Sequence, residues 1–369
     1  MWLLFAFYGG ENVFWKIKKI LSFAAVLCST AAIFAIPGVS PSVPDSSGQF
    51  VYYRDYTFTR ESYIGIMYYD ESTYGIRYFS PADVKNSLPE LSMLVLITID
   101  PNKTSGVEFT GEKVDPFPSS QDETDIINYL HSFVYDLFPM RQKAGLITGR
   151  TERTEDYAQF GGEVKLEYDP MIPVLNLRKI TTADKKTALL AVTGGQLVSS
   201  SDTSFVDFKG LPDKIADKSH SFKPNKKAKA SVVPIETEGL PTQSVKIDSQ
   251  WEQKSAGLWT LGNEAMLSVV SLPIASETHK LQLLRRLMLG SDHSYPNWNQ
   301  LSIKETGSGT SVRQVFYDSK AKSFTYDFKE LRNIADSMNS IFSLTVYAGS
   351  YMPNKKYFDS VVSSYTVTK

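Results

Sequence analysis

The strongest constraint on the fold is a repeated aromatic pattern in residues 62–81, which read SYIGIMYYDESTYGIRYFSP. Two runs rich in tyrosine and isoleucine flank residues 70–73, a short acidic and hydroxyl-bearing segment. Aromatic and β-branched residues favour strands, so two such runs around a polar segment predict a β-hairpin. We expect Tyr69 to pair with Tyr74 in this hairpin. Because an isolated hairpin is only marginally stable, the chain is expected to add further strands to it.

The expected pairing gives the hairpin tyrosines a structural role. It places Tyr78 opposite Gly65 and Tyr68 opposite Gly75. An aromatic ring across from a strand glycine covers the exposed backbone there, which stabilises the sheet. The alternative is that the aromatic residues contact a ligand or a partner. The candidate contact residues are Tyr68, Tyr69, Tyr74, Arg77 and Tyr78.

The remainder of the first half of the chain predicts more strands around one helix. Residues 50–62 are expected to form the strand before the hairpin, and the almost wholly apolar residues 91–100 a strand that is buried on both faces. Residues 119–141 carry apolar side chains at helical spacing, so they predict a helix that packs on the sheet. Residues 171–198 predict a second hairpin.

The second half begins after a change in composition. Residues 209–243 hold four prolines and seven lysines with little apolar periodicity, which predicts a linker or a long exposed loop. A strand is then expected over residues 265–274 and a helix over residues 277–289. Ser276 is the expected N-cap of this helix, and Gly290 its left-handed C-cap. The remaining expected elements are a hairpin over residues 312–328, a strand over residues 341–349 and a last short helix led by Asn354.

These elements predict an α+β protein with two domains, each an antiparallel sheet packed against one or two helices. A chain of 369 residues exceeds one ordinary core, which also favours two domains. The expected divisions are a signal peptide over residues 1–35, a flexible lead-in over 36–49, a first domain over 50–208, a linker over 209–243 and a second domain over 244–369.

The N-terminal segment predicts export. Lys16, Lys18 and Lys19 precede an apolar run over residues 20–35, which is short for a membrane-spanning helix. Pro37 follows and ends any helix there. The pattern is typical of a cleaved signal peptide. A retained membrane anchor is the alternative, and residues 1–12 read as a mis-annotated start.

The cysteine content indicates the cellular compartment in which the protein is located. Cys28 is the only cysteine and lies inside the apolar run, so the mature chain has neither a disulfide nor a thiol nucleophile. Export without disulfides favours a bacterial periplasm. Leu27 before Cys28 and the apolar residues after it are unlike a lipoprotein signal, so a lipid anchor is the less favoured alternative. After cleavage the protein is not expected to be integral to the membrane.

Composition and motifs argue against several kinds of chemistry. The net charge of −1 gives no global attraction to nucleic acid. The four histidines show no metal-ligand spacing, and no phosphate-binding or dinucleotide-binding glycine motif is present. Residues 307–309, Gly-Ser-Gly, lack the spacing of a serine-hydrolase motif and are expected to form a hairpin turn. The sequence therefore predicts no catalytic residues, no metal site and no cofactor, and it favours a non-enzymatic protein.

Two segments resemble known families. The final strand and helix, which end in FDSVVSSYTV, resemble the end of the Mog1/PsbP-like α+β domains. Residues 63–81 resemble a hairpin of the LolA/LolB-type lipoprotein carriers through Gly65, Tyr68, Arg77, Tyr78 and Pro81. The chain as a whole resembles exported bacterial proteins of unknown function that are common in spirochaetes. The carrier resemblance implies a half-open barrel that holds a lipid or acyl chain.

The functional expectation is a non-enzymatic, exported binding or envelope-assembly protein, whose partner is another protein or an apolar ligand in the envelope. A lipid or lipoprotein carrier with a half-barrel is the second hypothesis. A hydrolase that uses two carboxylates is the third, because such residues need no local motif.

Export is directly testable. Because the basic residues and the short apolar run end at Ala35, we expect cleavage near that residue and a mature chain that begins in the lead-in. N-terminal sequencing of the protein from the envelope fraction measures this. A chain that retains residues 13–35 in the membrane fraction would show that the segment is an anchor.

Overall fold

The computed structural model describes residues 47–70, 73–99, 107–109, 124–130, 133, 150–196, 208, 210–212, 214–215, 220–290, 293–306 and 308–368. The expected signal segment and most of the lead-in lie outside these residues. Ser42–Lys369 form one compact unit. Within the described part of the chain, no helix has both the length and the apolar character that a membrane crossing requires.

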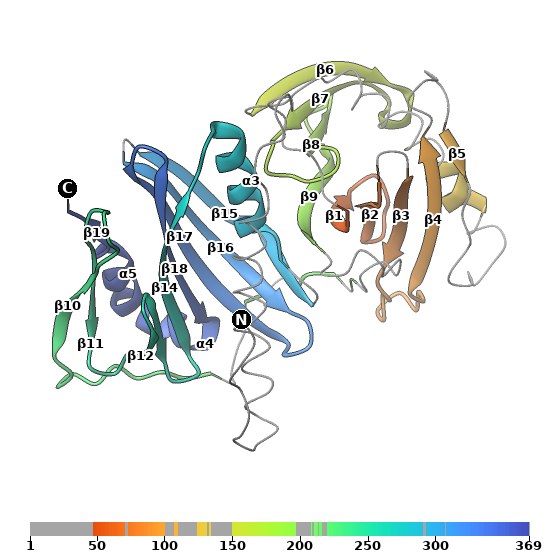
Figure 1. Ribbon diagram of the computed structural model, residues 1–369. Helices are drawn as coiled ribbons and strands as arrows, with labels where there is room; N and C mark the ends of the chain where they lie inside the picture. The colour runs from red at the N-terminus through yellow and green to blue at the C-terminus, as the bar shows by residue number, and fades with distance from the viewer. Residues whose placement is uncertain are drawn as a thin grey trace, which may run out of the picture. The chain divides into compact units, whose positions relative to one another are not determined.

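The first large sheet has nine antiparallel strands in the order β5-β4-β3-β2-β1-β9-β8-β7-β6 (Figure 1). Its strands are β1 (Gln49–Asp55), β2 (Ser62–Tyr68), β3 (Thr73–Ser80), β4 (Leu91–Ile99), β5 (Val107–Phe109), β6 (Thr151–Tyr157), β7 (Gly162–Tyr168), β8 (Leu177–Thr182) and β9 (Thr187–Gln196), with the short 3-10 helix η2 (Ala158–Phe160) between β6 and β7. The strand expected over residues 50–62 is shorter, because β1 ends at Asp55, residues 56–61 form a loop and Ser62 begins β2. The strand expected over residues 91–100 is confirmed over residues 91–99, and the hairpin expected over residues 171–198 is confirmed over residues 177–196.

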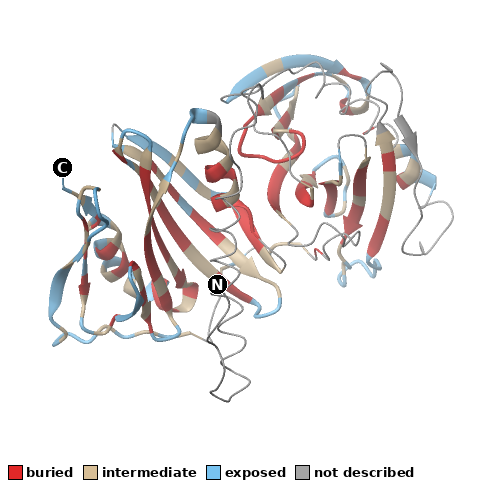
Figure 2. Cartoon of the chain, in the orientation of Figure 1, coloured by how far each residue is buried: buried red, intermediate tan, exposed pale blue. Residues whose placement is uncertain are grey.

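Side chains alternate between the two faces of this curved sheet. We call the face that carries Ile64 and Ile76 the inner face, and the face that carries Met67 and Phe79 the outer face. Both faces are buried along the central strands, whereas the edge strand β6 is mostly exposed (Figure 2). A sheet that is apolar on both faces needs a cover on each of them.

Two segments cover the inner face. The helix expected over residues 119–141 is described over residues 124–130, where Leu130 joins the inner-face core together with Phe133. Residues 169–176, between β7 and β8, add Ile172 and Val174 to the same core. Removing these apolar side chains from water provides the main stabilisation of this half of the fold.

The hairpin of residues 62–81 forms, but the expected register is wrong by one residue. Tyr68 pairs with Tyr74, and Tyr69 belongs to the turn. The Tyr69 amide donates to the Thr73 carbonyl, and the Asp70 carboxylate accepts a hydrogen bond from the Thr73 amide at 2.8 Å. The turn is therefore one residue longer on the β2 side than the expected pairing allowed.

The corrected register removes the expected tyrosine–glycine pairs. Gly65 lies opposite Arg77, and Gly75 lies opposite Met67. On its other side Gly65 pairs with Tyr52 of β1, so an aromatic residue does oppose this glycine, but it comes from the preceding strand. A shift of one residue exchanges the two faces of a strand, which is why the register decides where each tyrosine points.

The second half contains a seven-stranded and a three-stranded antiparallel sheet, in the orders β12-β13-β14-β18-β17-β16-β15 and β10-β11-β19. Their strands are β10 (Ala230–Ile235), β11 (Gln243–Asp248), β12 (Glu252–Ser255), β13 (Leu258–Leu261), β14 (Ala265–Pro273), β15 (Ser294–Thr306), β16 (Gly309–Asp318), β17 (Ser323–Ala335), β18 (Met338–Tyr347) and β19 (Thr366–Val367). The helices are α3 (Glu277–Met288), α4 (Ala348–Tyr351) and α5 (Lys355–Ser363), with the 3-10 helix η3 (Met352–Asn354) between the last two.

Helices cover both faces of the seven-stranded sheet. Helix α3 packs Leu284 and Leu287 against one face. Helix α5 places Phe358 in the core on the other face, together with Phe342 of β18 and the three-stranded sheet. The Ser276 hydroxyl accepts a hydrogen bond from the third helical amide at 3.2 Å, so the expected N-cap is confirmed.

The expected left-handed C-cap at Gly290 is wrong. Helix α3 ends at Met288, and the next residue, Leu289, has an extended backbone with φ −79° and ψ 139°. The extended exit brings the Gly290 carbonyl to the Gln196 amide at 3.1 Å, and a bridge joins Gly290 to Gly195 of β9. Glycine is required because a Cβ at position 290 would lie 1.7 Å from the Ser294 carbonyl oxygen.

The expected linker over residues 209–243 contains ordered structure. Strand β10 pairs with β11, and its Val233 and Ile235 pack against the core beneath α5. Earlier in the same segment, the His220 ring stacks on the Tyr347 ring, with the two ring centroids 3.6 Å apart. These apolar and aromatic contacts, which periodicity does not reveal, attach the lysine-rich segment to the second half. The division of the chain into two domains stays a prediction.

The fold class is therefore mainly antiparallel β-sheet with few helices, which fits the expected α+β class only loosely. The missed elements include β12, whose polar composition carries little strand signal, and β13, whose four residues are too few to show a periodic pattern.

The close approach at Gly290 generates a stability prediction. Gly290→Ala places a methyl group against backbone, so we expect the free energy of unfolding to fall by on the order of 3 kcal/mol. Urea denaturation measures the change. The control is Gly239→Ala, where no atom lies within 4 Å and φ is +76°, so only about 1 kcal/mol of backbone strain is expected. Equal losses in the two variants would contradict the close-approach argument.

Candidate functional site

The structure separates the five sequence-predicted contact residues. Tyr68, Tyr74 and Tyr78 lie on the inner face, where the Tyr68 and Tyr74 rings meet edge to face at 5.5 Å. Tyr69 and Arg77 belong to the outer face. Because the two groups lie on opposite sides of the sheet, a single ligand on one face contacts at most three of the five residues.

Tyr78 is the most deeply buried of the three candidate tyrosines on the inner face. Its side chain is 1% exposed, and its hydroxyl lies 2.9 Å from the Ser62 hydroxyl. The Phe58 ring packs edge to face against it at 5.7 Å. Burial raises the pKa of Tyr78 above its usual value. These contacts are those of a core residue with a satisfied hydroxyl group.

Asp55 is the buried carboxyl group beside this cluster. It accepts hydrogen bonds from the Thr57 amide at 2.7 Å, from the Thr57 hydroxyl at 2.6 Å and from the Tyr129 hydroxyl. Burial raises the pKa of Asp55, and the hydrogen bonds from Thr57 and Tyr129 oppose that shift. The contacts tie the end of β1 to the helix that covers the inner face, so the group has a structural role.

Two neighbouring loops at this end of the sheet present a different kind of surface. Residues 56–61 join β1 to β2, and residues 81–90 join β3 to β4; we call them together the loop pair. Arg60 Nη2 donates to the Pro81 carbonyl at 3.1 Å and to the Pro89 carbonyl at 2.7 Å. One guanidinium group therefore holds the two ends of the second loop together and attaches this loop to the first.

The second loop is also ordered internally. The backbones of Asp83 and Leu88 exchange two hydrogen bonds of 3.0 Å. The Asp83 carboxylate accepts from the Asn86 side chain at 2.6 Å and from the Lys85 and Asn86 amides at 3.1 and 3.2 Å. Led by the Asn86 side chain, these hydrogen bonds lower the pKa of Asp83. The loop thus holds one conformation without burying its tip.

The loop pair exposes apolar side chains. Val84 is 88% exposed, Tyr56 43% and Leu88 38%. Only two other large apolar residues are exposed among the described residues, Val232 and Met352. Single exposed apolar residues are ordinary, but three of five on two connected loops form a local cluster.

A buried polar cluster beneath α3 is a second candidate. The Lys329 ammonium group contacts the Asp327 carboxylate, which also accepts from Thr345 at 2.9 Å and from Gln314 at 3.1 Å. Burial lowers the pKa of Lys329 to about 7. Gln314 also donates to the Leu287 carbonyl at 3.1 Å, so the cluster connects three strands to the end of α3. Lys329 is only 8% exposed, so we interpret the cluster as structural.

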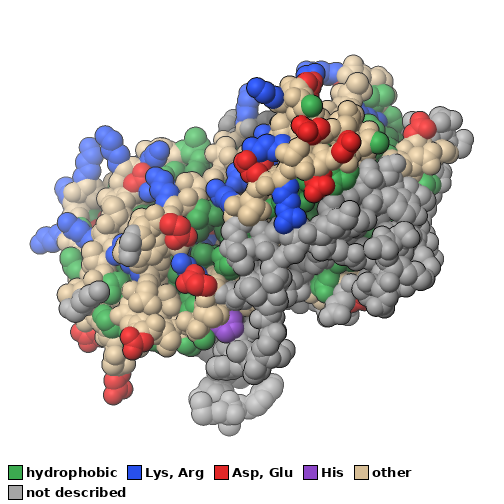
Figure 3. Space-filling model, turned by 90° about the horizontal axis from the view of Figure 1, so that it is seen from above, with side chains coloured by type: hydrophobic (Ala, Val, Ile, Leu, Met, Phe, Trp, Pro, Cys, Tyr) green, Lys and Arg blue, Asp and Glu red, His purple; other side chains and the backbone are tan. Residues whose placement is uncertain are grey.

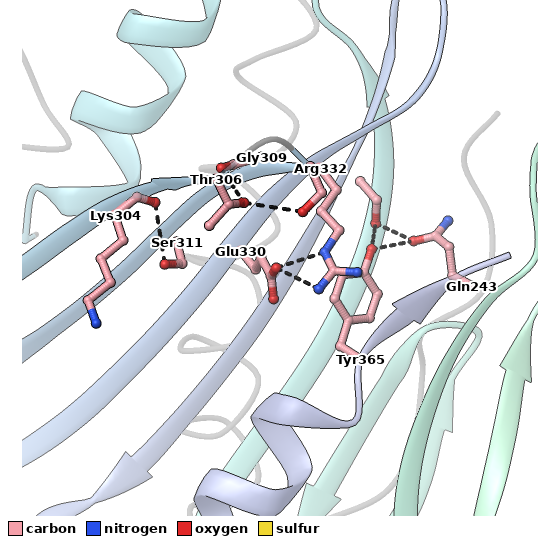
Figure 4. Close-up of polar contacts among 10 residues, drawn as sticks. Gln243, Lys304, Thr306, Gly309, Ser311, Glu330, Arg332 and Tyr365 are labelled. Atoms are coloured by element: carbon pink, nitrogen blue, oxygen red, sulfur yellow. Dashed lines mark hydrogen bonds and ion pairs between the residues drawn. The ribbon is translucent and has the colours of Figure 1, made fainter. Parts of the chain in front are cut away.

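A third polar cluster joins the three-stranded sheet to the seven-stranded sheet (Figure 4). The Tyr365 hydroxyl lies 3.1 Å from Gln243 Oε1 and 2.6 Å from the Ser340 hydroxyl, and burial raises the pKa of Tyr365 to about 12. The Arg332 guanidinium group lies 4.8 Å from the Tyr365 ring centroid and pairs with Glu330 at 2.7 Å. This cluster fixes the C-terminal strand in place.

The same view shows the β15–β16 hairpin. The Thr306 hydroxyl donates to the Gly309 carbonyl at 2.9 Å, and Thr306 pairs with Gly309 across the turn. The pairing of Thr306 with Gly309 fits the expected hairpin turn, and Gly307 itself lies outside the described residues.

Metal-ligating residues do not gather in the described part of the chain, where no group of three or more histidine, cysteine or acidic side chains could hold an ion. His131 and Cys28 lie outside the described residues. His220 lies 3.4 Å from the Glu264 carboxylate, and its ring also stacks on Tyr347. On the face in Figure 3, basic and acidic side chains are interspersed.

Sequence reasoning missed the loop pair. The available signal was the spacing of Pro81 and Pro89 around Asp83 and Asn86, which are turn-forming residues. That pattern predicts an ordered loop, but the exposure of Val84 follows only from the fold.

Two family models match the chain. Residues 48–206 match one described as "Domain of unknown function (DUF7954)", and residues 236–366 match one described as "Domain of unknown function (DUF7955)". None of the curated proteins that were compared with the chain matches it.

The chain is also similar to two solved structures. The first is cyanobacterial PsbP (CyanoP) from Synechocystis sp. PCC 6803, with 12% identity, a TM-score of 0.27, and coverage of 40% of this chain and 98% of that chain. The second is the core factor of S. cerevisiae, with 10% identity, a TM-score of 0.12, and coverage of 87% and 52%. Both scores are too low for either likeness to carry an argument.

The contacts of Tyr78 generate a prediction about its role. Tyr78→Ala should lower the free energy of unfolding by about 3–5 kcal/mol, because it empties a buried aromatic position. Tyr78→Phe should cost only about 1 kcal/mol, for the hydrogen bond with Ser62. Tyr56→Phe, at an exposed tyrosine, is the control and should change stability by less than about 0.5 kcal/mol. Unaltered stability of Tyr78→Ala in urea denaturation would show that the inner-face tyrosines serve binding.

Proposed function

We propose that this protein is a non-enzymatic, exported binding protein of the cell envelope that recognises a protein partner through the loop pair. The observation that carries the proposal is an ordered loop whose most exposed apolar side chain, Val84, lies at its tip. The basic segment and the short apolar run near the N-terminus support export to the envelope.

The fixed conformation of the loop and the exposure of Val84 together favour binding of a partner. A loop that is already held in one conformation loses little conformational entropy on binding, so more of the contact energy appears as affinity. Arg60 and Asp83 provide that order through hydrogen bonds, and neither needs the loop tip to be buried. An exposed Val84 costs solubility unless a partner covers it, and protein interfaces commonly centre on a few apolar residues inside a polar rim.

The neighbouring side chains favour a protein over a lipid surface. Lys85 and Asn86 follow Val84, and both are exposed. Membrane-surface segments bury a continuous apolar face with large side chains. The loop pair instead offers separate apolar groups between polar ones, which matches a shallow pocket with hydrogen-bonding groups at its rim.

The inner face is less favourable for a lipid carrier. A carrier needs space beneath its sheet for an acyl chain. Here Leu130, Phe133 and Val174 occupy the inner face and are fully buried against the strands. A hydrolase gains no support from Asp55, because its hydrogen bonds join structural groups.

The proposal is tested by photo-crosslinking from the loop. A photoreactive amino acid in place of Lys85 should give one discrete protein adduct in intact cells. The adduct should be lost when Val84→Glu is added, because a charge at the centre of the contact is costly to desolvate. Val84→Glu should change the free energy of unfolding by less than about 0.5 kcal/mol, since the residue is exposed.

Two controls locate the contact. The same probe in place of Lys320, on the exposed turn of the β16–β17 hairpin, should not give the adduct. Val232→Glu, at the exposed apolar position of β10, should leave the Lys85 adduct intact. An identical adduct from both probe positions, a lipid adduct by mass spectrometry, or no adduct from position 85 would overturn the proposal.

A further inference from the structure

An aromatic cage on the outer face holds a side chain from the segment between the two large sheets. We define the aromatic cage as Tyr52, Tyr63, Phe79 and Tyr295, which come from β1, β2, β3 and β15. Phe208 lies among them and is 0% exposed. Its ring stacks on Tyr52 at 4.3 Å and meets the others edge to face, Tyr63 at 5.2 Å, Tyr295 at 5.5 Å and Phe79 at 6.4 Å.

The segment is held by side chains. Phe208 fills the aromatic cage, and Leu211 packs on the same outer-face cluster. Residues 208 and 210–212 belong to no strand or helix. Among the described residues, no hydrogen bond joins Phe208, Gly210 or Leu211 to either sheet. The attachment therefore resembles that of a short peptide with two anchoring side chains, three residues apart, in a preformed apolar site.

Gly210 between the anchors meets a geometric requirement. Its φ is +77°, a backbone conformation that favours glycine. A Cβ at this position would lie 3.6 Å from the Tyr63 hydroxyl oxygen, so the chain passes directly over the tyrosine that forms one wall of the aromatic cage. The resident segment thus has the pattern Phe-x-Gly-Leu, in which each fixed position has its own physical reason.

We propose that the aromatic cage and the apolar surface beside it form a peptide-binding site for a phenylalanine–x–glycine–leucine segment of a partner protein, and that Phe208, Gly210 and Leu211 of this chain occupy the site as an intramolecular competitor. The aromatic cage selects a phenyl ring because ring faces and edges surround it. The glycine permits the turn over Tyr63, and the leucine covers the adjoining apolar surface.

The tether explains how the site is controlled. A segment joined to its site has a high effective concentration, so a free peptide competes poorly while the resident segment is intact. Weakening the resident segment should therefore uncover binding in trans. The aromatic cage adjoins the loop pair, because the Tyr63 hydroxyl donates to the Glu61 carboxylate. Its test measures peptide binding to the purified protein, so the outcome is distinct from that of the crosslinking test of the proposed function.

The experiment uses the full-length mature chain with Phe208→Ala and a synthetic peptide of residues 206–214, VDFKGLPDK, in which Phe208 is the only aromatic residue. Isothermal titration calorimetry should show one site on the variant, and the peptide should raise its melting temperature. The intact protein should bind the peptide at least about tenfold more weakly, because its own segment competes.

Three controls define the specificity. The peptide with alanine in place of phenylalanine should not bind. Phe222→Ala, which removes another aromatic residue of the same lysine-rich segment but one that packs on Tyr357 and Phe358, should gain no affinity for the peptide. A peptide that keeps Phe, Gly and Leu at their spacing but carries serine and lysine at its other positions should bind the Phe208→Ala variant within about tenfold of the native peptide, since the anchors provide the contacts.

A milder variant covers the case in which Phe208→Ala does not fold. Leu211→Ala keeps the aromatic anchor and removes the second one, so peptide affinity should lie between those of the intact protein and of Phe208→Ala. Absence of peptide binding to every folded variant would overturn the proposal. Binding of the native-flank peptide alone would also overturn it, because the site would then recognise only its own chain.

Discussion

The rest of the structure depends on the close backbone contact where Gly290 meets strand β9. The Gly290 carbonyl accepts from the Gln196 amide. A Cβ at Gly195 would lie 2.6 Å from the Phe50 ring, and a Cβ at Gly290 would lie 1.7 Å from the Ser294 carbonyl oxygen, so both positions of the bridge require glycine. One turn of helix earlier, Arg285 donates to the Pro170 carbonyl at 2.9 and 2.6 Å and to Asn176 at 2.6 Å. A buried guanidinium group and a backbone bridge thus connect the second half to the first, and β15, which carries Tyr295, begins just after the bridge.

Three clusters of buried polar groups among the described residues lie where two elements meet. Asp55 joins β1 to the inner-face helix, Lys329 and its neighbours join three strands to α3, and Tyr365 joins the last strand to the large sheet. Buried polar groups are costly unless they are satisfied, so such clusters specify a unique arrangement more than they add stability. The buried groups Asp55, Lys329 and Tyr365, whose pKa values are shifted by burial, therefore have structural roles, and the features that favour recognition lie in loops and in the segment between the sheets.

The hairpin and the linker show how far sequence reasoning reaches. Local composition predicted the β2–β3 hairpin and its turn, but not the position of Tyr69 in the turn, because a one-residue change in loop length is invisible to composition and exchanges both faces. For residues 209–243, lysine and proline content predicted a linker. Phe208, just before that segment, is buried, and Val233 within it is partly buried; their partners include Tyr52 and α5, which lie more than 25 residues away in sequence. No window of local periodicity contains those partners.

The sequence by itself determined the strand-rich character, the helix capped by Ser276 and the main hairpins, because alternation, capping and turn chemistry act within a few residues. Its motifs also predicted which kinds of site are disfavoured, namely metal sites and sites that bind phosphate groups or dinucleotides. Only the tertiary structure decided that Gly290 bridges to β9, that Arg60 closes the loop displaying Val84, and that Phe208 enters an aromatic cage. These depend on strand order and on close packing between segments far apart in the chain, and the free energy that selects them comes from burial of surfaces that meet only when the whole unit has formed.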